Sequence, residues 1–167
     1  MNVYKSSFLI IGKGVTYEHC KNFFEENSID YKYIDTKDSI GIKNNNIILS
    51  QECQERLNQK KINLDEIDYF VVSPGIPKDN YLISQLSKYK SDVITDIDIV
   101  QNIIDAKLIC VTGTNGKTST VSLLAEVLNA NSKKAIACGN NGTSVFEALK
   151  KRYEYVVLEI SSYQLEY

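Results

Sequence analysis

The strongest chemical signal in the sequence is a glycine-bearing turn between an apolar run and a helical pattern. Its residues are Gly113, Thr114, Asn115, Gly116, Lys117, Thr118 and Ser119. Backbone N–H groups converge in such a turn, and the helix that follows points its partial positive charge at an anion. Lys117 adds a full positive charge, and the Thr118 hydroxyl can ligate the magnesium ion that accompanies a nucleoside triphosphate. The turn therefore predicts binding of ATP or GTP.

The spacing of this turn is tighter than that of the common phosphate loop. The pattern G-x-x-x-x-G-K-[ST] requires a glycine at position 111, where this chain has Val111. A glycine turn before a helix can also form without any ligand. Gly-Lys-Thr at a helix start is difficult to explain in that way, so phosphate binding is the preferred interpretation.

A second signal is the carboxylate of Glu159, which ends an otherwise apolar run. Burying a carboxylate is costly unless it is paired, hydrogen-bonded or bound to a metal. In phosphate-loop proteins an acidic residue at the end of a neighbouring strand holds the magnesium ion, so we expect Thr118 and Glu159 to share it. Asn140, Ser161 and Gln164 follow strands at the same expected sheet edge. They could form plain turns or supply polar contacts to a ligand.

Two more turns follow predicted strands in the first half of the chain. Gly12-Lys13-Gly14 is similar to the start of a dinucleotide fingerprint, with Tyr17 in the place of the third glycine. Asp35 ends the next strand, where an acidic residue can meet a ribose or a base edge. Ser73-Pro74-Gly75 ends another strand. For both turns, a rigid turn without a ligand and a contact with an anionic ligand remain open.

The composition is that of an ordinary globular protein, with 167 residues, 43% hydrophobic and 24% charged, and a net charge of −2. This balance carries no electrostatic signature of nucleic-acid binding. No apolar run approaches the roughly 20 residues of a membrane helix. The four cysteines lack metal-ligand spacing, so we expect reduced thiols in a cytoplasm. A monomer is the favoured state.

Short apolar runs alternate with helical patterns, which indicates an α/β fold with parallel sheets covered by helices. The expected strands are 8–11, 31–35, 47–49, 69–72, 92–95, 108–111, 135–138 and 155–160, and the expected helices are 16–27, 79–88, 96–104, 118–129 and 144–150. We predict a Rossmann-like domain at residues 1–105 and the first part of a P-loop-type ATP-binding domain at residues 106–167. The latter is expected to be truncated, because a parallel nucleotide-binding sheet needs more strands to bury its core.

Four segments together resemble the Mur ligase family. They are Ser73-Pro74-Gly75-Ile76-Pro77, residues 113–119, Gly139-Asn140-Asn141-Gly142, and Leu-Glu-Ile-Ser-Ser-Tyr-Gln-Leu-Glu at residues 158–166. The phosphate-loop segment is shared with folylpolyglutamate synthases. The first and last segments distinguish the members of the family from one another, and they indicate the member that adds D-glutamate. The resemblance covers the whole chain but only the front part of the longer family proteins.

The resemblance implies an ATP-dependent amide ligase of peptidoglycan precursor synthesis in the bacterial cytoplasm. The carboxylate of UDP-MurNAc-L-Ala would take a phosphoryl group from ATP, and the D-glutamate amine would attack the acyl phosphate. Lys117 and Glu159 would be catalytic, with Mg²⁺ at Thr118 and Glu159. The residues implied to contact the UDP-substrate are Val15, Thr16, Asp35, Thr36, Lys37, Ser73, Pro74 and Gly75, with Asn140, Ser161 and Gln164 on the path to the nucleotide. Lys37 stands where the family commonly has arginine.

Other functions remain open at this stage. One is another Mur or folylpolyglutamate-type ligase, and a second is a non-enzymatic module that binds a UDP-sugar or nucleotide. A third is a kinase or ATPase of a different phosphate-loop lineage, which the tight loop and the preceding domain disfavour. The resemblance also implies a histidine metal ligand, a carbamylated lysine, an adenine pocket and a glutamate-binding third domain later in the family's chain. We therefore expect these 167 residues alone to have no ligase activity.

Overall fold

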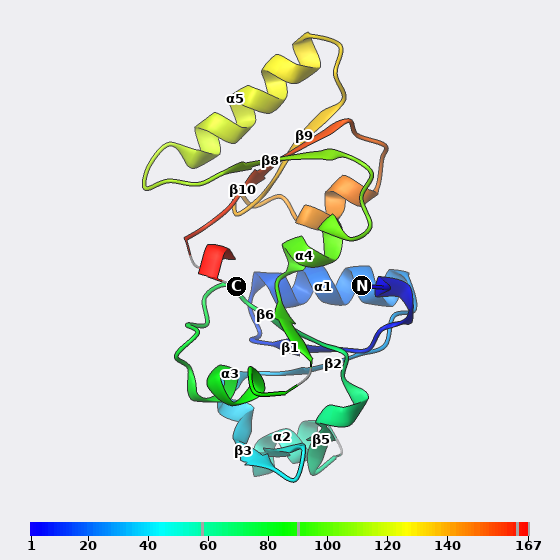
Figure 1. Ribbon diagram of the computed structural model, residues 1–167, viewed down its shortest axis with the longest axis vertical. Helices are drawn as coiled ribbons and strands as arrows, with labels where there is room; N and C mark the ends of the chain where they lie inside the picture. Colours follow the sequence, from blue (N-terminus) through cyan, green and yellow to red (C-terminus); the bar gives the residue numbers. More distant parts are fainter. Residues whose placement is uncertain (58, 90, 163, 167) are drawn as a thin grey trace. The chain divides into compact units, whose positions relative to one another are not determined.

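The computed structural model describes residues 1–57, 59–89, 91–162 and 164–166. The chain forms two compact units, Met1–Thr95 and Asp96–Tyr167. Each unit contains a parallel sheet with helices (Figure 1), as the alternating sequence pattern predicts. The division falls before helix α4 (Asp96–Gln101), which packs against the short 3₁₀ helix η4 (Val145–Leu149) of the second unit. The two-domain assignment with a boundary after residue 105 stays a prediction.

The main sheet of the first unit has four parallel strands in the order β2-β1-β6-β7. Their bounds are β1 (Phe8–Ile11), β2 (Tyr31–Ile34), β6 (Tyr69–Val72) and β7 (Asp92–Ile94). The chain places β2 on one side of β1 and the later strands on the other. In open α/β sheets, ligands bind outside the carboxyl ends of the strands at such a switch point. The turns after β1 and β6 therefore lie where a ligand is expected.

Two helices of the first unit follow the predicted pattern. Helix α1 (Val15–Glu26) buries Tyr17, Cys20, Phe23 and Phe24 at helical spacing. The Phe24 ring stacks on the Phe8 ring of β1 with centroids 4.7 Å apart. Helix α3 (Tyr81–Leu86) is shorter than the predicted 79–88, because Asn80 caps its start by accepting the Leu82 N–H at 3.0 Å.

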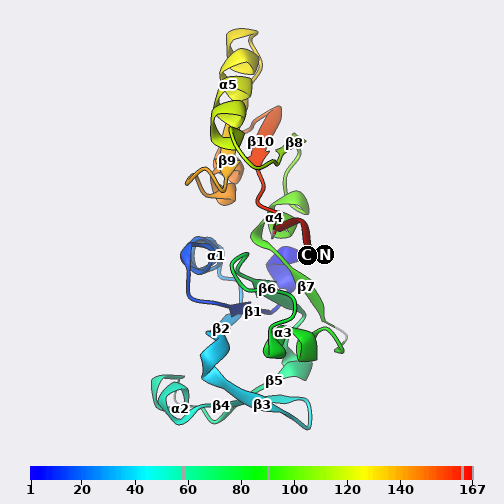
Figure 2. The ribbon, with the colours of Figure 1, turned by 90° about the vertical axis from the view of Figure 1, so that its left-hand side faces the viewer.

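A small antiparallel sheet forms the rest of the first unit (Figure 2). It contains β3 (Ser39–Lys43), β4 (Asn46–Leu49) and β5 (Lys61–Asn63), with helix α2 (Gln51–Leu57) between the last two. The prediction that 47–49 joins a parallel sheet was wrong. Asn44 and Asn45 both have positive φ, 49° and 54°, and this conformation makes the two-residue turn that folds β4 back onto β3. The sequence did not predict β3, α2 or β5.

The second unit is built on three parallel strands in the order β8-β10-β9. Their bounds are β8 (Lys107–Val111), β9 (Ala135–Gly139) and β10 (Tyr155–Glu159). Helix α5 (Lys117–Ala130) packs along this sheet (Figure 1), where Val121 and Ala125 contact a cluster with Ala135 and Val157. The central strand β10 is buried from Val156 to Glu159. The second unit thus positions its loops from a rigid central strand.

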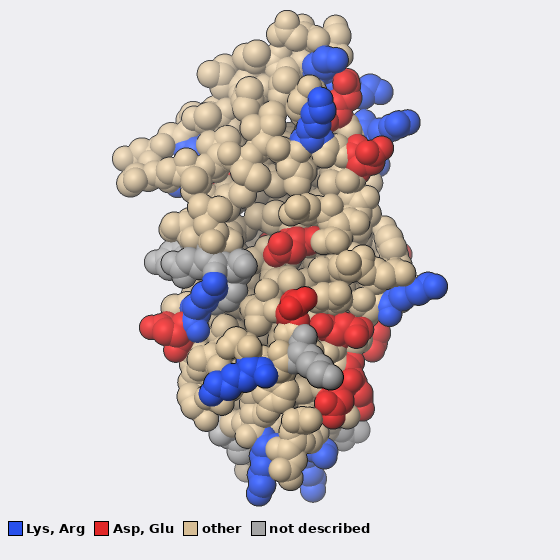
Figure 3. All heavy atoms as spheres, in the orientation of Figure 1, with Lys and Arg blue, Asp and Glu red and all other residues tan. Residues whose placement is uncertain are grey.

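Other predicted helices are shorter or differently wound. The prediction of a helix at 144–150 corresponds to the 3₁₀ helix η4, and the predicted 96–104 corresponds to α4. The remaining 3₁₀ helices are η1 (Val3–Lys5), η2 (Thr36–Asp38), η3 (Leu64–Glu66) and η5 (Gln164–Glu166). Among the described residues, no helix is long and apolar enough to cross a membrane. Figure 3 shows acidic and basic side chains mixed on the face drawn.

Candidate functional site

The strands of the second unit all end at the same level. Glu159 of β10 pairs with Val111 of β8 on one side and with Gly139 of β9 on the other. Because the strands are parallel, the loops that follow them leave from one edge of the sheet. The structure therefore brings the turn at 112–116, the turn at 140–143 and the segment after Glu159 to a common edge.

The glycine turn leads directly into helix α5. Gly116 has a left-handed conformation with φ 75°, and α5 begins at Lys117. The Lys117 Nζ donates a hydrogen bond to the carbonyl oxygen of Gly113 at 2.8 Å. Residues Gly113 to Gly116 are exposed, so the turn is open to a ligand. Helix start, ammonium group and turn backbone thus occupy one small region, which suits phosphate binding.

Glu159 lies beside this turn as a buried carboxylate. Its side chain is 3% exposed, and Thr118 Oγ1 donates a hydrogen bond to its Oε2 at 2.7 Å. On the other side, Asn140 Nδ2 donates to Glu159 Oε1 at 3.4 Å. These two neutral donors offset part of the cost of burying the charge. Glu159 therefore contacts two other predicted residues, Thr118 at the start of α5 and Asn140 in the turn after β9.

The oxygen atoms at this position suit magnesium. Mg²⁺ is commonly bound through one or two carboxylates together with substrate phosphates and water. Thr118 and Glu159 supply one hydroxyl and one carboxylate, 2.7 Å apart, at the start of the helix that would face the phosphates. The described residues contain no cluster of three or more His, Cys, Asp or Glu side chains. One hydroxyl and one carboxylate at a helix start thus fit a cation that arrives with a nucleotide.

Gly139 shapes this site, although the sequence analysis did not assign it a role there. Its φ is +105°, and a Cβ built on it would lie 2.4 Å from the carbonyl oxygen of Glu159. Only a residue without a side chain allows β9 to approach β10 so closely. The signal in the sequence is a glycine at the last position of a strand, immediately before a polar turn. Gly139 therefore allows β9 and β10 to stay paired up to Glu159, the last residue of β10.

The cysteine next to Gly139 is a buried thiol with a raised pKa. Cys138 is fully buried, and burial, followed by the nearby Asp96 carboxylate, raises the pKa of its thiol to about 12. Cys20 and Cys53 are also buried, whereas Cys110 is exposed on β8.

Ser161 and Gln164 bind each other in the segment after β10. The backbone N–H and the hydroxyl of Ser161 both donate to Gln164 Oε1, at 2.9 and 3.1 Å. Tyr163 of the same motif lies outside the described residues. The two side chains thus stabilise a local turn close to Glu159, and their contact with substrate stays a prediction.

The turns after β1 and β6 of the first unit pack directly on each other. Gly12 has φ +98°, and a Cβ there would lie 2.8 Å from both Ile76 Cδ1 and Ser73 Oγ. Ser73 is buried, and its hydroxyl donates to the Gly12 carbonyl at 3.4 Å. Close packing of the two turns accounts for Gly12 without any ligand. Pro74 is half-buried and Gly75 is exposed at the same edge.

The other residues predicted to contact the UDP-substrate lie at this same edge. Val15 and Thr16 open α1, and Val15 is 70% exposed. Asp35, Thr36 and Lys37 follow β2, which is in register with β1 and receives the Gly12 N–H on its Ile34 carbonyl at 2.9 Å. The parallel pairing therefore collects the predicted residues of the first unit at the carboxyl ends of β1, β2 and β6.

Tyr17 fills the position where a dinucleotide fingerprint has its third glycine. Its ring lies 4.7 Å from the ring of Tyr33 in β2. Burial, followed by the neighbouring Tyr33, raises the pKa of Tyr17 to about 12, so the phenol stays neutral at physiological pH. An aromatic pair thus separates α1 from the sheet here, in a place where the fingerprint glycine would permit closer packing.

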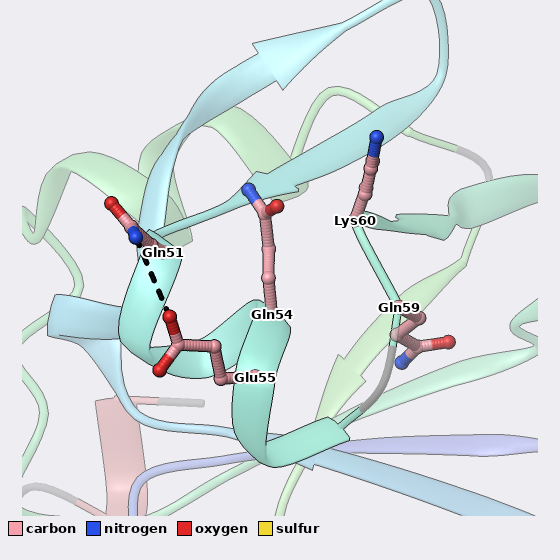
Figure 4. Close-up of a pocket in the computed structure, with 5 residues that line it drawn as sticks. All are labelled: Gln51, Gln54, Glu55, Gln59 and Lys60. Atoms are coloured by element: carbon pink, nitrogen blue, oxygen red, sulfur yellow. Dashed lines mark hydrogen bonds between the residues drawn. The ribbon is translucent and has the colours of Figure 1, made fainter.

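A separate cavity lies beside α2 (Figure 4). Its volume is about 590 Å³, and it is lined by Gln51, Gln54, Glu55, Gln59 and Lys60. Gln54 Nε2 donates to the Leu49 carbonyl at 2.8 Å, and Gln51 Nε2 donates to Glu55 Oε1 at 3.4 Å. The side chains of Gln51, Gln54 and Glu55 therefore form hydrogen bonds within α2 and to β4. No predicted site residue takes part in this cavity.

Comparison with known proteins bears directly on this arrangement. Residues 111–167 match the Mur ligase middle domain. The chain is 36% identical over 170 residues to the UDP-N-acetylmuramoylalanine–D-glutamate ligase of Protochlamydia amoebophila, covering 99% of this chain and 38% of that relative. The ligase of the same name from Blochmanniella floridana is 36% identical over 162 residues, covering 97% of this chain and 36% of the relative.

These similarities concern part of the relatives. The chain spans somewhat more than a third of their length. A solved structure of UDP-N-acetylmuramate:L-alanyl-gamma-D-glutamyl-meso-diaminopimelate ligase from Neisseria meningitides aligns with 92% of this chain and 52% of its own, with 18% identity and a TM-score of 0.46. The matched middle domain begins at the last residue of β8 and contains the turn, Thr118 and Glu159. On the evidence of that domain and of the D-glutamate ligases, the chain belongs to the Mur ligase family.

Proposed function

We propose that this chain carries the UDP-substrate and ATP sites of a ligase that joins D-glutamate to UDP-MurNAc-L-Ala in peptidoglycan precursor synthesis. The names of the relatives support this choice of substrates. The observation that carries the ATP site is the 2.7 Å hydrogen bond between Thr118 and Glu159, next to the Lys117 turn. It joins a helix start, a hydroxyl and a buried carboxylate, the groups that phosphate-loop proteins use for a nucleotide and its metal ion.

The proposed reaction begins with activation of the alanyl carboxylate. A carboxylate is a poor electrophile, because neither oxygen is a good leaving group. One of its oxygens attacks the γ-phosphorus of ATP, ADP leaves, and an acyl phosphate forms. The D-glutamate amine then attacks the carbonyl carbon, loses a proton, and phosphate leaves as the amide bond forms.

The residues of the second unit would act on the phosphoryl transfer. The Lys117 ammonium would stabilise the negative charge that spreads over the transferred phosphoryl group. The exposed backbone from Gly113 to Gly116 would hold the phosphates. Thr118 and Glu159 would hold Mg²⁺. The bound ion would neutralise part of the negative charge of the phosphates. Asn140 would orient Glu159 through their 3.4 Å contact.

The first unit would bind the UDP end of the substrate at the edge that collects its predicted residues. Thr36 and Lys37 offer a hydroxyl and an ammonium group, and the exposed Gly75 offers backbone N–H to an anion. The switch point between β1 and β6 supports this location.

Titration of the 167-residue chain tests the proposal. We expect saturable binding of UDP-MurNAc-L-Ala without ATP, and no amide product when ATP, Mg²⁺ and D-glutamate are added, as the resemblance places further catalytic elements elsewhere in the family's chain. Binding is measured by calorimetry and product by chromatography. MurNAc-L-Ala, which lacks UDP, is the matched ligand control and should not bind.

Each outcome has a distinct meaning. Absence of UDP-MurNAc-L-Ala binding by the folded chain would contradict the role proposed for the first unit. Formation of amide product would contradict the expectation that these residues are inactive alone. Binding without turnover is also what a non-enzymatic module would show, and restored turnover in a longer ligase containing this segment would distinguish the two.

A further inference from the structure

Asp38 is a buried carboxylate that the sequence analysis did not single out. It is 3% exposed, at the end of the 3₁₀ helix η2 that follows β2. The three residues before it, at 35–37, are those proposed to contact the UDP end of the substrate. Asp38 itself faces the protein interior, so its charge is not offered to a ligand. Such a carboxylate calls for a structural or positioning explanation.

Asp38 forms two hydrogen bonds with Asp35, at the other end of the short segment that precedes it. Its Oδ2 accepts the backbone N–H of Asp35 at 2.8 Å, and its own N–H donates to the Asp35 carbonyl at 3.0 Å. The Thr36 hydroxyl donates to Asp35 Oδ1 at 3.3 Å. A bond from a backbone N–H to a carboxylate is stronger than a neutral one. These contacts fix the conformation of Asp35 and Thr36, while Lys37 remains exposed.

Asp38 also links this segment to the small antiparallel sheet. Its carbonyl accepts the Ser50 N–H at 2.7 Å. Ser50 precedes α2, where its carbonyl accepts the Gln54 N–H at 2.9 Å and its hydroxyl accepts the Cys53 N–H at 3.3 Å. The small sheet and its helix thereby provide a rigid support for the turn at 35–38.

We propose that Asp38 is a positioning residue that holds residues 35–37 in the conformation that receives the uridine diphosphate group. This inference rests on the proposed function of the first unit. By accepting the Asp35 N–H, the Asp38 carboxylate fixes where the Asp35 side chain, the Thr36 hydroxyl and the Lys37 ammonium project. Its inward direction also keeps a second negative charge away from the diphosphate.

Uridine diphosphate titrated into the folded chain and its variants is the test. Asp38→Ala removes the acceptor and should weaken UDP binding by about tenfold or more, the effect of losing one charge-assisted hydrogen bond. Asp38→Asn keeps an acceptor oxygen at the same place and should stay within about threefold of the unaltered chain. Asp65→Ala, which removes an exposed carboxylate from the 3₁₀ helix η3 of the same unit, is the matched control and should not change UDP affinity. ATP binding should be unchanged in all three variants.

The outcomes separate this inference from the proposed function. UDP affinity of Asp38→Ala within twofold of the unaltered chain would overturn the positioning role alone. Failure of the unaltered chain to bind UDP would overturn the role of the first unit and this inference with it. If Asp38→Ala does not fold, amide hydrogen exchange in the unaltered chain decides. A protected Asp35 amide, equally protected in Asp38→Asn, supports the role, and an unprotected Asp35 amide overturns it.

Discussion

Replacing Lys117 by alanine is expected to lower acyl-phosphate formation by roughly 10²–10³-fold or more, the usual loss when one preorganised group that stabilises transition-state charge is removed. The measurement uses this chain joined to the remaining segment of the Blochmanniella floridana relative, with hydroxylamine trapping of the acyl phosphate. In the 167-residue chain, the same change should weaken ATP binding, because Lys117 lies on the turn that would surround the phosphates. Binding of UDP-MurNAc-L-Ala should stay within about twofold.

Lys133→Ala is the matched control for the loss of a positive charge from the second unit. Lys133 precedes β9 at the end of the sheet opposite to Gly139, where it pairs with Glu154 at 3.4 Å. Its removal should leave acyl-phosphate formation unchanged, since an exposed pair contributes little. If Lys117→Ala lowered UDP-substrate affinity as much as it lowered ATP affinity, the role given to Lys117 would be wrong.

Replacing Gly139 by alanine is expected to destabilise the second unit by roughly 2–5 kcal/mol, from the strain of a left-handed backbone together with overpacking. The added methyl group would lie 2.4 Å from the Glu159 carbonyl oxygen, so β9 and β10 must separate at their carboxyl ends. Glu159 would then move away from Thr118. We expect both a lower melting temperature, measured by calorimetry, and loss of ATP binding at temperatures where the variant is still folded.

Gly142→Ala separates the effect of backbone strain from the effect of the steric clash. Gly142 also has a positive φ, +93°, but no atom lies within 4 Å of a Cβ built there. This variant carries the backbone strain without the steric clash, at the other end of the same turn. The melting temperature of Gly139→Ala should fall by at least about 4–8 °C more than that of Gly142→Ala, which corresponds to roughly 1 kcal/mol for a unit of this size. Equal decreases would show that the approach to Glu159 contributes nothing.

Local patterns predicted the parts of the fold whose causes are local. The apolar runs at 8–11 and 69–72 are strands, and α5 begins within one residue of the predicted start because Gly116 and Lys117 specify a turn followed by a helix. The grouping of Thr118, Glu159 and Asn140 could also be anticipated, since parallel strands deliver their carboxyl ends to one edge.

Features that depend on strand register could not be predicted from the sequence. The capping-box spacing of Asp35 and Asp38 is local, but the hydrogen bond from the Ser50 N–H to the Asp38 carbonyl joins residues that no spacing rule brings together. The need for glycine at 139 arises only when β9 and β10 are aligned. The antiparallel sheet was missed because Gly41 interrupts the apolar pattern of β3 and because Asn44 and Asn45, whose positive φ angles form the turn, lack the Asn-Gly signature of a two-residue hairpin.

The strand order of the second unit has a consequence during protein synthesis. Strands β8 and β9 do not touch each other, because β10, the last of the three in the chain, lies between them. While the chain is being made from its amino end, the glycine turn after β8 emerges long before the strand that supplies Glu159 and joins the other two. The glycine turn and Glu159 therefore come together only after residues 155–159 have left the ribosome and inserted between their neighbours. The contact between Thr118 and Glu159 is thus coupled to completion of the sheet.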